Sequence, residues 1–430
     1  MGWLPPRAIR WNFTVMGLDI SLFVFALSFA SWYGVLPLFV SHLTASSLAL
    51  GAIPALRSAN SLPPLFVAGF TERLPRKKPF IVFVTIFERL PYLVLAVATP
   101  LLALTHPTAL LWLLFVMLGL STLTGGLVSA AWIDLLSRML PADWRGRFFG
   151  YALAIGGLLG IVGSGLAALF LQSFSWYIAV TICFACAFAC LVVSFMFIAV
   201  GREPAVSRTN AATPTREATK MWHRVPTVLR ENGNLRWYLI AILLITFATT
   251  ATSFFTVDAK RTQHLSDGDA SLYAVALLIA STLGNVLWGY VGDRFGHKRT
   301  VEIGALLTGL ASVLAVVSRT SDWGRVGYVA VFLLIGLGTS AQQLTALTFI
   351  VDFAPPDQVP TFIGLASSLQ APFAFGAPLL AAWFADWQGF PALFTVTAAL
   401  GFAGALLVLR QVRDPRVPAR HSLVAADAPR

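Results

Sequence analysis

The sequence predicts an all-α membrane protein with 12 transmembrane helices in two pseudo-symmetric six-helix bundles. Three observations support this prediction: the composition, the regular recurrence of apolar segments, and an internal repeat. Of the 430 residues, 57% are hydrophobic and 11% are charged, whereas an ordinary soluble domain carries about 25% charged residues. The composition therefore excludes a water-soluble protein.

Twelve apolar segments follow one another along the chain, separated by short polar gaps. Each is close to the roughly 20 residues that cross a bilayer, and each must be helical because lipid offers backbone groups no water. The segments span residues 13–40, 45–69, 79–104, 108–137, 147–171, 174–200, 236–257, 270–291, 300–318, 325–351, 361–385 and 390–410. The predicted parts are an N-terminal bundle (1–200), a cytoplasmic linker (201–235), a C-terminal bundle (236–410) and a cytoplasmic tail (411–430).

Lysine and arginine residues fall mainly into alternate gaps. Of the 30 in the chain, 24 lie in the two terminal tails or in the gaps that follow even-numbered segments, and 4 lie in the other gaps. Positive residues gather on the cytoplasmic side of membrane proteins. We therefore expect a multi-pass protein of the cytoplasmic (inner) membrane with both termini in the cytoplasm. This distribution explains the net charge of +11 without nucleic-acid binding.

Two short motifs occur once in each half of the chain. The segment "ERLPRKK" at 72–78 matches "DRFGHKR" at 293–299, with an offset of 221 residues. The segment "PADWRGRFFG" at 141–150 matches "PPDQVPTFIG" at 355–364, with an offset of 214. Both pairs occupy equivalent gaps, after the second and the fourth helix of each half. The chain is therefore predicted to consist of two halves in the same orientation.

The helix count, the repeat and the turn "GYVGDRFGHKR" at 289–299 resemble the major facilitator superfamily, whose two halves are parallel repeats. The second-half turn matches the family's inter-helix motif at Gly289, Asp293, Arg294, Gly296, Lys298 and Arg299. The first-half copy departs from it, with Glu72 in place of aspartate and Pro75 in place of the second glycine.

The resemblance implies a cytoplasmic gate that closes across the two bundles. Its implied members are Glu72, Arg73, Asp134, Gly150, Asp293, Arg294, Gly296, Asp352 and Gly364. The acids Glu72 and Asp293 would cap the helices that begin near Thr361 and Arg147, because a helix N-terminus carries a partial positive charge. The two arginines would then pair with Asp134 and Asp352, and Gly150 and Gly364 would allow close approach.

Four ionisable side chains, Asp19, Arg57, Glu88 and Arg89, lie inside predicted first-half helices. They lie about 10–18 Å from the cytoplasmic ends of their helices, where an unpaired charge is costly. Because Glu88 and Arg89 point about 100° apart on a helix, we expect Arg57 to pair with Glu88 or Asp19 instead. The four form a predicted coupling or substrate site. The alternative is a static ion-pair network that orders the first bundle.

The second half is predicted to lack such buried charges. Its mid-helix polar residues are neutral, and four of them are predicted to line a cavity: Asn285, Gln342, Gln343 and Gln370. A charged first half and a neutral second half suit coupling combined with substrate binding.

The resemblance implies a secondary active transporter that works by alternating access. We expect proton-coupled efflux of a small organic molecule by an antiporter, acting as a monomer in the lipid bilayer. Two alternatives remain: a proton-coupled importer of an anionic solute bound by Arg57, and a non-transporting assembly factor or receptor on the same scaffold. The sequence contains no known catalytic motif, so we expect no catalytic residue, metal site or cofactor.

Overall fold

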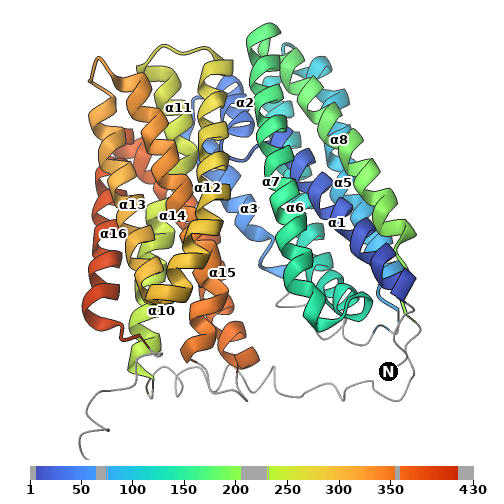
Figure 1. Ribbon diagram of the computed structural model, residues 1–430. Helices are drawn as coiled ribbons and strands as arrows, with labels where there is room; N and C mark the ends of the chain where they lie inside the picture. Colours follow the sequence, from blue (N-terminus) through green and yellow to red (C-terminus); the bar gives the residue numbers. More distant parts are fainter. Residues whose placement is uncertain are drawn as a thin grey trace, which may run out of the picture.

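The computed structural model describes residues 6–63, 74, 76–204, 230, 232–353 and 359–414. These residues form 14 helices and no strand (Figure 1). The first half contains α1 (Pro6–Phe29), α2 (Val35–Leu43), α3 (Ser47–Ala59), α5 (Lys78–Leu102), α6 (Pro107–Met139), α7 (Ala142–Ser173) and α8 (Trp176–Val200). The second half contains α10 (Gly233–Thr249), α11 (Thr252–Thr262), α12 (Asp267–Phe295), α13 (His297–Ser318), α14 (Gly324–Phe353), α15 (Val359–Gln388) and α16 (Phe390–Gln411).

The described residues include 10 helical stretches that are long and apolar enough to cross a membrane. Two predicted spans are not among them. The span 45–69 runs beyond the described part of α3, and the span 361–385 lies inside α15, a helix of 30 residues. The prediction of an all-α membrane protein is confirmed, and the predicted number of spans is close to the number found.

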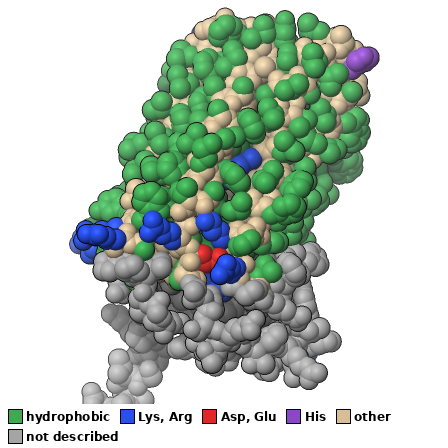
Figure 2. All heavy atoms as spheres, turned by 90° about the vertical axis from the view of Figure 1, so that its right-hand side faces the viewer, with side chains coloured by type: hydrophobic (Ala, Val, Ile, Leu, Met, Phe, Trp, Pro, Cys, Tyr) green, Lys and Arg blue, Asp and Glu red, His purple; other side chains and the backbone are tan. Residues whose placement is uncertain are grey.

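The helices of each half gather into one bundle (Figure 1). Helix α1 begins and α16 ends at the same end of the molecule, which we call the terminal end. The opposite end carries the turns at 44–46 and 263–266, and we call it the distal end. Figure 2 shows one flank of the molecule, where apolar side chains cover the surface and Lys and Arg side chains form a belt near the terminal end. This is the surface that a lipid bilayer requires.

The first helix of each half is interrupted, which the sequence did not reveal. The predicted span 13–40 was expected to be a single helix, and this expectation was wrong, because the chain turns at 30–34 between α1 and α2. In the second half, Thr250 and Ala251 separate α10 from α11 but keep right-handed helical angles, and Gly233–Thr262 forms one apolar stretch long enough to cross a membrane. Adding the repeat offset of 221 to residues 30–34 gives 251–255, which meets the interruption between α10 and α11 at residue 251. The residues of both interruptions are as apolar as a helix, and a turn leaves no mark in such a pattern.

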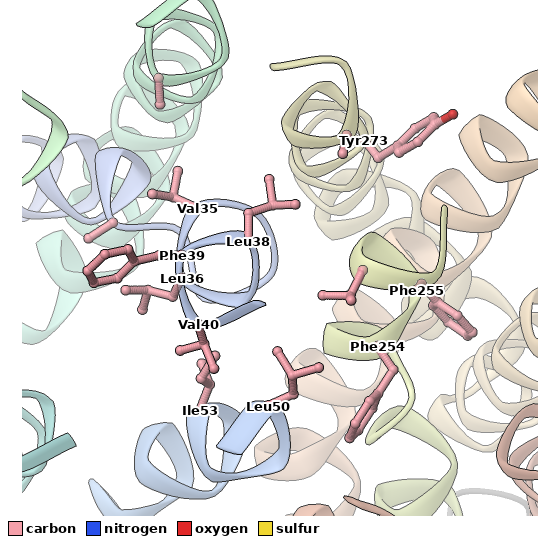
Figure 3. Close-up of a cluster of buried hydrophobic side chains, with 14 of the residues drawn as sticks. Val35, Leu36, Leu38, Phe39, Val40, Leu50, Ile53, Phe254, Phe255 and Tyr273 are labelled. Atoms are coloured by element: carbon pink, nitrogen blue, oxygen red, sulfur yellow. The ribbon is translucent and has the colours of Figure 1, made fainter. Parts of the chain in front are cut away.

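The distal end is where the two bundles pack most closely. Buried apolar side chains of α2 and α3 meet α11 there, and Figure 3 shows Leu38 and Leu50 facing the helix that carries Phe254. Small residues bring the backbones together. A Cβ atom at Gly51 would lie 2.5 Å from the carbonyl oxygen of Pro378, and one at Gly34 would lie 2.7 Å from Cβ of Ala274.

Candidate coupling site and gates

Arg89 is the centre of a buried ionic cluster in the first bundle. It lies on α5 with 4% of its surface exposed, and its guanidinium lies 3.5 Å from Glu88 Oε2 and 3.8 Å from Asp19 Oδ1 on α1. It also donates hydrogen bonds to the Leu191 carbonyl (3.0 Å) and to Ser194 Oγ (3.1 Å), both on α8. Ser194 in turn donates to Asp19 at 2.6 Å. The cluster thus joins α1, α5 and α8 and contains two carboxylates for one arginine.

This arrangement corrects the predicted pairing. Glu88 and Arg89 were expected not to satisfy each other, but they form an ion pair, and Arg89 rather than Arg57 lies beside Asp19. The helical angle between neighbours describes Cβ directions only. A long arginine side chain with a forked end can reach acids on two sides. Gly125 of α6 also makes room, since a Cβ atom there would lie 2.8 Å from Glu88 Oε1.

Arg57 lies apart from these acids. Its guanidinium lies over the ring of Tyr33, 4.9 Å from the ring centroid. Among the described residues Arg57 forms no ion pair, and its side chain is only partly buried. The structure therefore separates the predicted site into an Arg89 cluster, made of Asp19, Glu88 and Arg89, and a separate Arg57.

Three ionisable side chains connect the bundles at the distal end. His42 of α2 contacts Asp267 of α12, with 2.6 Å between Nε2 and Oδ2, and Lys260 of α11 lies 2.5 Å from the other oxygen of Asp267. The imidazole ring of His42 stacks on Trp176, with 4.8 Å between centroids. We call these three the distal latch. The sequence does not single them out as site residues, because all three lie in the gaps between predicted spans.

Further polar contacts cross between the bundles near the latch, including one from Gln172 Nε2 to Asp269 Oδ1 at 3.3 Å. The carboxylate of Asp386, at the end of α15, accepts hydrogen bonds from the backbone N–H groups of Ser47 (2.9 Å) and Leu48 (3.2 Å). It thereby caps the N-terminus of α3 from the other half of the chain. Thr256 Oγ1 of α11 donates to the carbonyl oxygen of Tyr33 at 2.5 Å. These contacts close the distal end.

A buried acid in the second half also corrects the prediction. Asp258 of α11 is 1% exposed, accepts a hydrogen bond from Tyr328 at 2.5 Å, and forms an ion pair with Arg319. The predicted apolar span ended at Val257, so the acid was assigned to a loop. The second half therefore carries a buried charge, although all of its partners lie within the same bundle.

The predicted gate residues at the terminal end are only partly described. Glu72 and Arg73 lie outside the described residues. Asp134 on α6 pairs with Lys77 (3.2 Å) and Arg138 (2.8 Å), so it already has two cationic partners within the first half.

The second-half members of the gate lie on three helices. Asp293 is on α12, Asp352 on α14 and Gly364 on α15, and the side chains of these two acids lie outside the described set. Arg294 is exposed and donates a hydrogen bond to Tyr290 Oη at 2.6 Å. Gly296 has a φ of +88° in the turn between α12 and α13, where a residue with a side chain would be strained.

Gly150 makes no close approach to any residue that the structure describes. A Cβ atom built on Gly150 would lie more than 4 Å from every described neighbour that is not adjacent in its own helix. The described ion pairs at the terminal end all join residues of the same half. The predicted gate remains a prediction, because Glu72, Arg73 and the side chains of Asp293 and Asp352 lie outside the described residues.

The four predicted cavity residues lie on three helices of the second half. Asn285 is on α12, Gln342 and Gln343 are on α14, and Gln370 is on α15. Asn285 and Gln343 are exposed, while Gln342 and Gln370 are partly buried. A cavity lined by the four remains a prediction.

Comparison with known proteins gives both a family and partial relatives. The family model of the Major Facilitator Superfamily matches residues 18–259 and 239–429. The chain is 24% identical over 183 residues to the Tetracenomycin C resistance and export protein of Streptomyces glaucescens, which covers 42% of this chain and 33% of that protein. It is 29% identical over 185 residues to the Gentisate transporter of Corynebacterium glutamicum, which covers 41% of each. These alignments span well under half the length of the relatives.

Solved structures match over nearly the whole chain, at low identity. A variant of the nucleoside transporter NupG has a TM-score of 0.72 and 12% identity, covering 94% of this chain and 100% of that one. A D-xylose-proton symporter has a TM-score of 0.65 and 14% identity, covering 95% and 97%. At such identities the likeness shows the fold alone. Because the family model matches both halves, this chain belongs to the major facilitator superfamily of membrane transporters.

Proposed function

We propose that this chain is a proton-coupled secondary transporter that exports a small organic molecule by alternating access. The Arg89 cluster is the observation that carries the coupling. Two carboxylates share one arginine deep in the first bundle, so full ionisation of both leaves an excess negative charge in a buried site. Binding of one proton removes that excess. The direction of transport draws support from the similarity to a resistance and export protein.

The conformation supports alternating access. Cross-bundle contacts hold the distal end together, while the described ion pairs at the terminal end all stay within one half. We place the terminal end in the cytoplasm of a cell whose inner membrane holds the protein, because positively charged residues gather at that end. The structure then represents an inward-facing state, and the turns carrying Asp293 and Glu72 would form the closed gate of the opposite state.

A second candidate is a proton-coupled importer of an anionic solute. One specific observation favours it, namely the partly exposed Arg57 without a described acidic partner. Import and export share the same coupling site. The two candidates differ in the pH gradient that drives accumulation.

The proton site is tested by binding at acidic and alkaline pH. A set of lipophilic cations, carboxylates and neutral compounds is screened for thermal stabilisation of the purified protein. We expect hits whose affinity changes with pH, and we expect Glu88→Gln and Asp19→Asn to remove that change. If both variants keep the pH dependence of the unmodified protein, the Arg89 cluster is not the proton site.

Glu302→Gln provides the matched control. Glu302 is a buried acid of α13 that lies beside two cations, 3.5 Å from Lys298 and 3.2 Å from Arg299. It has no excess negative charge to neutralise, so its variant should retain the pH dependence. For each hit, proteoliposomes with a trapped pH-sensitive dye then show whether movement of the compound carries protons, and in which direction.

A further inference from the structure

We propose that Arg57 is the anion-binding residue of the transport site, and that the transported molecule is a small carboxylate with an apolar body. This inference rests on the proposed transport function and specifies its substrate class. Its starting point is the separation of Arg57 from the Arg89 cluster.

The position of Arg57 on α3 places it at the inner limit of the closed distal end. Leu50, Ile53 and Arg57 are three and seven residues apart, so they share one face of the helix. Leu50 and Ile53 are 1% and 0% exposed, and Leu50 faces α11 across the bundle interface (Figure 3). Arg57 follows about 10 Å further toward the terminal end, where burial becomes partial. On this face of α3, Arg57 is the first charged residue that follows the buried side chains of Leu50 and Ile53 toward the terminal end.

The described acidic side chains on the elements around Arg57 already have other hydrogen-bond or ion-pair partners. Each of five described carboxylates on neighbouring elements has a partner other than Arg57: Asp19 and Glu88 with Arg89, Asp258 with Arg319 and Tyr328, Asp267 with His42 and Lys260, and Asp386 with the start of α3. A charge within a membrane span is costly without a counter-charge. The guanidinium fork of an arginine fits a carboxylate through two parallel hydrogen bonds. A solute carboxylate would therefore supply the missing counter-charge.

Tyr33 gives the site an apolar side and a connection to the gate. Its ring lies against the guanidinium of Arg57, and a flat apolar group of the solute can pack beside it. Tyr33 lies in the break between α1 and α2, and its carbonyl oxygen accepts the hydrogen bond from Thr256 of the other bundle. A solute on Arg57 thus contacts a residue whose own bond exists only while the distal end is closed. Such a contact gives the ligand different affinities for the two states.

The test compares acids with their amides. Purified full-length protein in detergent is titrated with benzoate and benzamide, and with phenylacetate and phenylacetamide, while thermal stability is followed. We expect the acid to stabilise the protein more than its amide in at least one pair. Arg57→Gln should lower the affinity for that acid by at least about tenfold, since a charged hydrogen bond is lost. Arg57→Lys should retain part of it.

The control separates a binding role from a structural one. Arg57 lies in the last turn of α3, where a cation also stabilises the helix end. A purely structural arginine would change the melting temperature of the free protein and leave the preference for acid over amide unchanged. Arg76→Gln, an exposed arginine at the terminal end, should leave both unchanged. Tyr33→Leu keeps the arginine and should weaken binding of the acids less than Arg57→Gln does.

Two outcomes overturn the proposal: neither acid is distinguished from its amide, or Arg57→Gln binds the acid as tightly as the unmodified protein does. Failure of the transport function has a different signature. If the acids bind through Arg57 but move across proteoliposome membranes no faster than in empty vesicles, the anion site stands and transport fails. If a cation or a neutral compound is transported with protons while the acids do not bind, transport stands and the substrate class is wrong.

Discussion

The two ends of the molecule use their charged residues differently. At the distal end fewer charges are present, and described polar contacts, among them those of His42, Asp386 and Thr256, run from one bundle to the other. At the terminal end charges are abundant, but the described ion pairs, such as Lys77 with Asp134, stay within one half. We propose that the abundant charge at the terminal end sets the orientation in the membrane, and that the few polar groups at the distal end hold that end closed.

The largest effect is expected from removing the cross-bundle cap of α3. Asp386→Ala deletes the carboxylate that accepts from Ser47 and Leu48, and loss of a helix cap costs about 1 kcal/mol. The distal-closed population relative to the distal-open one should fall roughly fivefold. Spin labels on the distal tips of the two bundles, placed after the native cysteines are replaced by alanine, would report the added long distance.

Asp386→Asn serves as the control for that change. The amide keeps one acceptor oxygen, so the shift should be clearly smaller than with alanine. An unchanged distance distribution in Asp386→Ala would mean that the cap does not hold the distal end closed.

The distal latch should have a smaller effect. His42→Gln removes the imidazole that contacts Asp267 but leaves Lys260 beside that acid. Because His42 and Lys260 are about a quarter exposed, the loss should be about 0.5–1 kcal/mol, measured by the same labels. Lys260→Met removes the 3.1 Å contact between Lys260 Nζ and His42 Nε2 but keeps the 2.6 Å contact between His42 and Asp267, so it should shift the distances less. Equal shifts in His42→Gln and Lys260→Met would show that the contact between His42 and Asp267 does not itself stabilise the closed distal end.

The predicted gate at the terminal end would stabilise the state in which that end is closed. Removing it should therefore shift the conformational equilibrium in the opposite direction, toward the state that is open at the terminal end. Asp293→Asn removes the acid expected to cap a helix N-terminus when that end closes, an interaction of about 0.3–1 kcal/mol. We expect cysteines introduced near Gly150 to react faster with a water-soluble thiol reagent. Unchanged reactivity at both ends of the protein would contradict the proposed gate.

The smallest effect is expected where an ion pair stays within one half. Asp134→Asn disturbs the contacts with Lys77 and Arg138, and the Asp134 side chain is 38% exposed. Thermal stability should fall by less than about 0.5 kcal/mol, and the label distances should stay as they are. A marked distance change would show that the terminal-end charges also control the conformation.

The sequence by itself determined the class of the fold and its repeated halves. Apolar length identifies membrane helices because every backbone polar group in lipid must be satisfied within the helix. The matching turns at 72–78 and 293–299 indicated the duplication, and the family model matches both halves. The pattern also identified Asp19, Arg57, Glu88 and Arg89 as ionisable residues inside membrane helices, since any charge within a long apolar run is detectable.

Only the tertiary structure decided how these charges are paired. Sequence spacing gives the direction of a side chain on its own helix, but a partner on another helix depends on packing and on side-chain reach. Arg89 reaches both acids while Arg57 rests on Tyr33. The helix interruptions at 30–34 and 250–251 and the cross-bundle bonds of Asp386 have the same origin. These features depend on how the two bundles pack against each other. A local sequence pattern contains no information about that packing.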